Sequence, residues 1–268
     1  MRQKMVVLAC FSVAALLAIA FTVSAQTPSS SAAPPAQGTA KAADLSGDWD
    51  AGAGASWNPK DRGGKILEDG TPYQPWALAK LKSERPGFGV NATFENTTDP
   101  NINYCDPFGL PRIYFNPSKF RFVQTPNVVY IIFEYGPTWI PVWMNRKHSD
   151  DPDPTWYGES IGWYENGDTL VVDSIGFNDK TWLDMVGRPH TEQLHLIQRY
   201  KRVDKDHLEY DVTFDDPGAY TKTWTGQKIF NASKTEFGRY MWVCTVSANK
   251  QFDDAVSKKT VTPSTPAK

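Results

Sequence analysis

The sequence predicts an all-β protein, a single antiparallel meander closed into a barrel and accompanied by one short helix in its N-terminal part. Beyond Cys105, nearly every apolar run is short and bounded by turn residues. Successive runs are separated by only a few residues, which is typical of hairpins. A sheet made of consecutive hairpins has to close or stack, because free strand edges pair with other chains.

The first 25 residues have the pattern of a secretory signal peptide. Arg2 and Lys4 precede an apolar stretch that runs from Met5 to Val23, and small residues end at Ala25. We therefore expect a secreted or periplasmic protein that keeps no integral membrane segment after cleavage. A retained membrane anchor is the alternative, but no polar stop pattern follows the apolar stretch.

Composition divides the rest of the chain into three parts. Residues 26–43 are Ser, Ala and Pro with almost no bulky apolar side chain, which predicts a disordered linker. Residues 44–252 are expected to form a single β-barrel domain, and residues 253–268 a flexible tail. The net charge of −2 provides no basic surface, so we expect no nucleic-acid partner.

Two cysteines, Cys105 and Cys244, lie within the expected domain. In an oxidising compartment a disulfide between them is the simplest interpretation. A thiol nucleophile or a metal ligand is the alternative, but the chain has no Cys-x-x-Cys spacing.

One segment has the signals of a helix, namely "YQPWALAKLKSERPG" at residues 73–87. Pro75 stands near its start, Leu78 and Leu81 are three residues apart, and Pro86-Gly87 provides a stop. The remaining elements are expected to be strands. Clear pairs are 119–124 with 128–135, 160–165 with 169–177, and 194–203 with 207–214.

The middle hairpin contains Asn166-Gly167, a strong signal for a two-residue turn. This turn predicts that Trp163 faces Leu170 and that Ile161 faces Val172, which makes one apolar face. Asp173 is then expected on the opposite face, together with the small residues Gly158, Ser160 and Gly162.

For the last hairpin, a three-residue loop at 204–206 gives the more consistent register. It places Tyr200 opposite Tyr210, and it gathers the charged side chains on the other face of the sheet. His195 then points outward, opposite Asp215. Continuing the same alternation backwards along the strand predicts that His190 and Glu192 point inward.

These inward groups suggest an acid–base site. His190 is the candidate base, and Glu192 or Asp179 would orient it. The alternative is that the polar side chains of the 177–192 segment only make turn and capping hydrogen bonds. The spacing His190-x-Glu192-x-x-His195 fits neither a strand nor a helix that converges on zinc, so we predict no metal and no cofactor.

A binding function requires a pocket of suitable shape and polarity, but no reactive group. Small-ligand pockets combine apolar walls with a few polar groups that fix orientation. The aromatic-rich sequence provides both kinds of residue, although several of the aromatics are expected to be ordinary core. The candidate ligand-binding residues are Trp143, Asp173, Asn178, Trp182, Asp184, Gln198, Tyr200, Tyr210 and Asp216.

Three blocks resemble an uncharacterised family of secreted bacterial proteins that is frequent in acidobacteria. They are "YCDPFGLPRI" at 104–113, "DPDPTWYGESIGWYENGDTLVVDSIGFNDKTWLD" at 151–184, and "PHTEQLHLIQRYKRVDKDHLEYDVTFDDPGAYTKTW" at 189–224. The resemblance implies a secreted β domain with a motif-rich loop, and it implies no reaction. A weaker similarity is to lipocalins, through Gly47-x-Trp49 at the start of a first strand and Arg239 near the last strand.

We therefore predict a lipocalin-like barrel that binds a small, partly apolar organic molecule, with residues 177–192 as the rim of its pocket. The first alternative is a cofactor-free lyase, isomerase or hydratase that uses the His190 site. The second alternative is a structural or envelope-interaction protein with a filled core.

Overall fold

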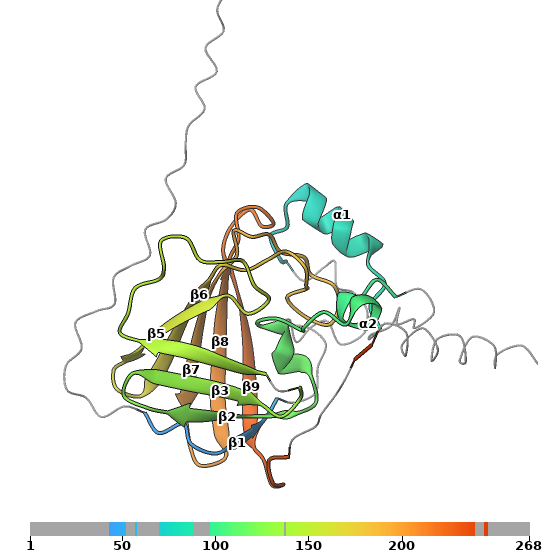
Figure 1. The fold of residues 1–268 in the computed structure, drawn as a ribbon. Helices are drawn as coiled ribbons and strands as arrows, with labels where there is room; N and C mark the ends of the chain where they lie inside the picture. The colour runs from blue at the N-terminus through green and yellow to red at the C-terminus, as the bar shows by residue number, and fades with distance from the viewer. Residues whose placement is uncertain are drawn as a thin grey trace, which may run out of the picture. The chain divides into compact units, whose positions relative to one another are not determined.

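The fold was analysed in a computed structural model, which describes residues 43–51, 57, 70–87, 97–136, 138–238 and 244–245. Nine strands form a closed barrel in chain order, so the prediction of an all-β barrel is confirmed (Figure 1). The strands are β1 (Asp48–Asp50), β2 (Lys119–Gln124), β3 (Val128–Phe133), β4 (Trp139–Met144), β5 (Glu159–Glu165), β6 (Thr169–Ile175), β7 (His195–Arg202), β8 (His207–Asp215) and β9 (Trp224–Ala232).

One pair of neighbouring strands departs from the expected meander. β4 and β5 run parallel, whereas all the other neighbours, including β1 with β9, are antiparallel. A parallel pair cannot be joined by a tight turn, because the chain must return to the end at which the first strand began. Residues 145–158 make this return, and Thr155 bridges to Phe177 on the way.

The helical segments lie between β1 and β2. The predicted helix is present as α1 (Pro75–Ser83), with a proline in its first turn and with Ala77 and Leu81 buried. Further along are α2 (Pro100–Tyr104) and a single 3-10 turn, η3 (Arg112–Phe115), all four residues of which are buried.

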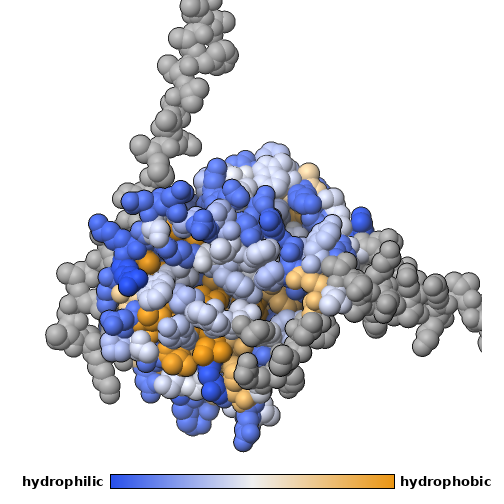
Figure 2. All heavy atoms as spheres, in the orientation of Figure 1, coloured by the Kyte–Doolittle hydropathy of each residue, from blue (hydrophilic) through white to orange (hydrophobic). Residues whose placement is uncertain are grey.

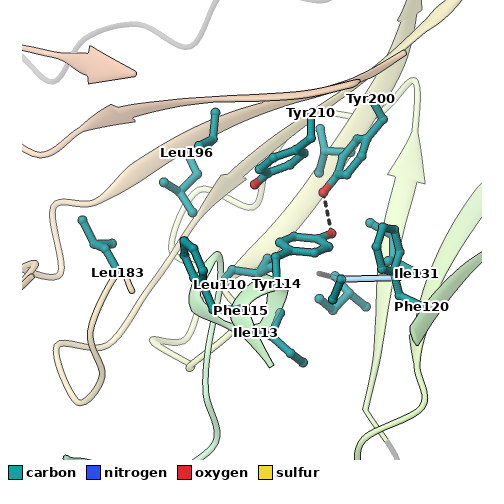
Figure 3. Close-up of a cluster of buried hydrophobic side chains, with 14 of the residues drawn as sticks. Leu110, Ile113, Tyr114, Phe115, Phe120, Ile131, Leu183, Leu196, Tyr200 and Tyr210 are labelled. Carbon is teal, nitrogen blue, oxygen red and sulfur yellow. Dashed lines mark hydrogen bonds between the residues drawn. The ribbon is translucent and has the colours of Figure 1, made fainter. Parts of the chain in front are cut away.

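The 3-10 turn η3 contributes Ile113, Tyr114 and Phe115 to the buried core of the barrel. The ring of Tyr114 contacts Phe120 and Phe133 on one side and Tyr210 and Phe230 on the other, with ring centroids 5.0–5.3 Å apart. Figure 3 shows Tyr114 between Phe120 and Tyr210, joined to Tyr200 by a hydrogen bond. The described part of the interior is therefore an aromatic core.

The two hairpin predictions had different outcomes. The register around 204–206 is confirmed, with Tyr200 opposite Tyr210 and His195 opposite Asp215. The register around Asn166-Gly167 is wrong by one residue, because Asp168 also belongs to the loop and Glu165 pairs with Thr169. Because side chains alternate between the two faces of a strand, this one-residue shift exchanges the faces of β5 relative to β6.

The corrected register places Asp173 opposite Ile161, and Trp163 opposite Val171. All four side chains therefore face the outside of the barrel, while Val172 faces the core. Asp173 therefore does not share a face with Ser160 and Gly162, as was predicted, because these two residues pair with Ser174 and Val172.

The predicted disulfide between Cys105 and Cys244 is present, with Cα atoms 5.5 Å apart. It joins the segment that carries η3 to the chain beyond β9. In the part of the chain that is described, no helix has the length and apolar character needed to cross a membrane. The visible face in Figure 2 is mostly hydrophilic, with an apolar area over β2 and β3.

Several predictions concern residues outside the described ones. These are the signal peptide at 1–25, nearly all of the linker at 26–43, the tail at 253–268 and the lipocalin-type Arg239.

Candidate functional site

The 177–192 segment that was predicted to form a pocket rim is mostly packed into the protein. Every residue from Thr181 to His190 is buried. Asp184 forms a fully buried ion pair with Arg188 and also accepts a hydrogen bond from the Val186 amide. These contacts hold the segment together internally, which is the turn-and-capping role that the sequence left open as the alternative.

In the described part of the chain, His190 forms no hydrogen bond with Glu192 or Asp179, the predicted partners of an acid–base site. The His190 imidazole is buried, its Nδ1 lies 3.3 Å from the Thr191 carbonyl oxygen, and its burial lowers its pKa. Glu192 and Asp179 are exposed. The inward prediction for Glu192 is wrong because β7 begins only at His195, and a turn at 191–194 interrupts the alternation.

The predicted ligand-binding residues inside the barrel bond to one another. The Gln198 Oε1 accepts hydrogen bonds from the hydroxyls of Tyr200 at 3.1 Å and Tyr210 at 3.0 Å. The Tyr200 hydroxyl also lies 2.6 Å from that of Tyr114. Buried polar groups need hydrogen-bond partners, and these side chains provide partners for one another within the core.

The other predicted ligand contacts have structural partners. Asp216 accepts hydrogen bonds from the amide and hydroxyl of Thr191, and the Asn178 carboxamide oxygen accepts one from the Lys180 amide. Trp182 is buried, with the Arg112 guanidinium 4.9 Å from its ring centroid. Trp143 is half-buried on the outer face of β4.

Asp173 is the predicted residue that the structure places in a cluster of titratable groups. Its Oδ1 lies 2.7 Å from the Nε2 of His195 and 3.1 Å from the Nε2 of His148. The Nδ1 of His148 in turn lies 3.0 Å from the Oε1 of Glu159. We call these four residues, Glu159, His148, Asp173 and His195, the wall cluster.

The wall cluster follows from the strand arrangement. Asp173 lies on the outer face of β6, and Glu159 and His195 are the first residues of β5 and β7. His148 comes from the connection at 145–158, which crosses outside the sheet because β4 and β5 are parallel. Three strands and one crossover therefore meet at this point of the outer wall.

The wall cluster has a defined charge state. Burial would raise the pKa of Asp173, but the hydrogen bonds from His148 and His195 outweigh burial and hold that pKa at about 2. Burial would lower the pKa of His148, but its bonds to Asp173 and Glu159 raise it above 6.5. Both nitrogens of His148 face carboxylate oxygens, and only the doubly protonated ring donates to both.

His195 differs from His148 in its exposure. The side chain of His195 is 23% exposed, compared with 6% for His148 and 5% for Asp173. Ile161 and Ile197 flank Asp173 on the neighbouring strands. The cluster thus combines buried charge, apolar neighbours and one partly exposed imidazole.

Sequence reasoning did not select Glu159, considered His148 only as a residue bordering an opening, and set His195 aside because that residue points outward. Its outward direction was correctly predicted. The available signal was "RKHSDDPDP" at 146–154, which is long and polar for a hairpin connection.

The described residues contain no group of three or more His, Cys, Asp or Glu side chains arranged to hold a metal ion. The fold and the site together define a closed, nine-stranded all-β barrel that carries a histidine–carboxylate cluster on its outer wall. No protein-family model, curated protein or solved structure matches this chain.

Proposed function

We propose that this is a small-molecule-binding barrel protein of an extracytoplasmic compartment, and that its ligand binds on the outer wall at the wall cluster. The observation that carries the proposal is the joint bonding of His148 and His195 to one buried carboxylate, Asp173. Buried charge of this kind is costly unless it is paired, and here one of the paired imidazoles is open to solvent. The disulfide is consistent with an oxidising compartment.

The charge of the cluster points to a ligand with a cationic or hydrogen-bond-donating group. Near neutral pH, Asp173 and Glu159 are ionised because both pKa values are lowered, and the pKa of His148 is raised by its bonds to them. Asp215 adds a further carboxylate opposite His195. The apolar neighbours suit a hydrocarbon or aromatic body, so a small organic amine is the ligand class that fits.

The test is an NMR titration with two probes that share a ring and differ in charge, benzylamine and benzoate. The chain has four histidines, so their ring signals can be followed individually at pH 6.5. We expect benzylamine to shift the His148 and His195 signals, with little effect from benzoate. His195→Gln should abolish binding, and the matched control His207→Gln, at the exposed start of β8, should retain it.

Equal shifts from both probes, or none, would contradict an amine-binding cluster. Native mass spectrometry of protein exported to a bacterial periplasm then tests binding without choosing a probe. A retained small molecule that is lost in His195→Gln supports the proposal, and ligand-free protein counts against it.

Acid–base chemistry is the second candidate function, and one observation favours it. Asp173 accepts from the Nε2 of His195, which leaves Nδ1 as the basic nitrogen of an oriented imidazole. Such a base removes protons next to a carbonyl group, as a lyase or an isomerase does. Deuterium exchange into acetophenone in heavy water should then be faster with the wild-type protein than with His195→Gln, and equal rates would exclude this chemistry for that probe.

A further inference from the structure

Lys228 occupies an unusual position for a lysine. It lies on β9 opposite Tyr210, a fully buried residue, so its side chain points to the inside of the barrel. The short strand β1 pairs only with Asn231 and Ala232 of β9. In the described part of the chain, the stretch of β9 that contains Lys228 therefore has a strand partner on one side only.

On its other side Lys228 meets η3. Its Nζ donates a hydrogen bond of 2.8 Å to the carbonyl oxygen of Tyr114. The same nitrogen lies 3.9 Å from the ring centroid of Phe115 and 5.9 Å from those of Trp57 and Phe230. The amine is thus lined by three aromatic rings and held by one backbone oxygen.

Two buried arginines are differently arranged. Arg112 pairs with Asp99, and Arg188 pairs with Asp184. For Lys228, the contacts that the described residues make include no carboxylate. Its side chain is half-buried, so solvent still reaches part of it.

Burial without a carboxylate makes the charged form unfavourable. It lowers the pKa of Lys228 from 10.5 to about 7. The Phe115 ring favours the cation, but this attraction is much weaker than that of a carboxylate. Near neutral pH a large share of the side chain is then the free amine, which is the nucleophilic form.

We propose that Lys228 is a reactive amine that binds small aldehydes covalently, as imines. The nitrogen lone pair attacks the carbonyl carbon, and a C=N bond replaces the C=O bond. The carbonyl oxygen leaves as water with the two amine hydrogens, so no oxidant or reductant takes part. The three surrounding rings are themselves buried, so their part is to give the amine its apolar environment.

This inference is independent of the wall cluster. Lys228 points to the inside of the barrel and His195 to the outside, on strands that are separated by β8. The amine probe for the wall cluster does not form an imine with lysine, so failure of one proposal leaves the other intact.

The experiment is reductive trapping with benzaldehyde and sodium cyanoborohydride at pH 7, followed by peptide mapping of each lysine. Lys201 is the internal reference, because its pairing with exposed Asp168 raises its pKa above 10.5. At pH 7 an amine of pKa 7 has about a thousandfold more neutral form than one of pKa 10.5. Lower basicity and burial reduce this advantage, and we expect Lys228 to be labelled at least about tenfold faster than Lys201.

Two further measurements complete the test. Lys228→Arg should lose the fast adduct, whereas Lys201→Arg should keep it. In the wild-type protein, the rate at Lys228 should level off above pH 7, while the rate at Lys201 should rise up to pH 10. The proposal is overturned if Lys228 is labelled no faster than Lys201 at pH 7, or if its rate keeps rising, and neither result depends on a variant that folds.

Discussion

Replacement of Asp173 by Asn should destabilise the protein in a pH-dependent manner. The amide keeps the shape of the side chain but removes the charge that both His148 and His195 contact. The pKa of Asp173 is about 2 in the folded protein, compared with 3.8 ordinarily. This difference corresponds to about 2 kcal/mol of folding free energy at pH values at which the carboxylate is ionised in both states.

The pH window follows from the two shifts. The depressed pKa of Asp173 contributes stability that is present above 3.8 and is lost as the pH falls through about 2. The raised pKa of His148 contributes stability that is present below 6.5 and is lost as the pH rises through the folded-state value. The difference between the wild-type protein and Asp173→Asn should therefore be largest between about pH 4 and 6.5.

Urea unfolding followed by tryptophan fluorescence, at a series of pH values from 2 to 8, measures this difference. Asp168→Asn is the matched control, because Asp168 pairs with Lys201 in an exposed position and such pairs contribute little. A difference of less than about 0.5 kcal/mol at pH 5.5, or one that does not change between pH 2 and 5, would refute the charge assignment.

Three further predictions concern stability at neutral pH, each measured by urea unfolding. Tyr114→Ala should cost about 3–5 kcal/mol, because it opens a cavity in the aromatic core; a smaller loss would mean that η3 is not a core element. Asp184→Asn should cost about 3–5 kcal/mol by leaving Arg188 without its buried carboxylate, and retention of stability would contradict that pairing. Replacing Cys105 and Cys244 by Ser should cost about 5 kcal/mol, since the bridge closes a loop across a sequence separation of 139; an unchanged midpoint would show that the bridge does not form.

Local pattern predicted the fold well wherever strands are joined by short loops. The 204–206 hairpin was predicted residue by residue, because opposite charges and aromatic pairs agree in only one register. The predicted register of the Asn166-Gly167 hairpin was wrong. Both residues adopt positive φ, as a two-residue turn requires, but Asp168 is also part of the loop, which lengthens it by one residue. One extra residue places Ile161 and Trp163, rather than Ser160 and Gly162, on the same face of the sheet as Asp173.

The site was harder to predict because it depends on contacts between segments distant in sequence. Nothing local to Tyr114 indicates that it lies in the barrel interior, where partners such as Phe230 come from the far end of the chain. His190 seemed to continue β7, but a turn at 191–194 breaks the alternation on which that inference rested. The hydrophobic pattern defines strand faces, and it does not define what fills the space between them.

The number of strands has a geometric consequence for the outer surface. In a closed barrel the number of antiparallel pairs of neighbouring strands must be even. A barrel of nine strands has nine neighbouring pairs, so they cannot all be antiparallel. One like-directed pair is the least that resolves this conflict, and it lies between β4 and β5. A ring of eight would join those strands by a simple reversal at one end, and His148 would never cross to Asp173; the odd count is what creates the meeting point.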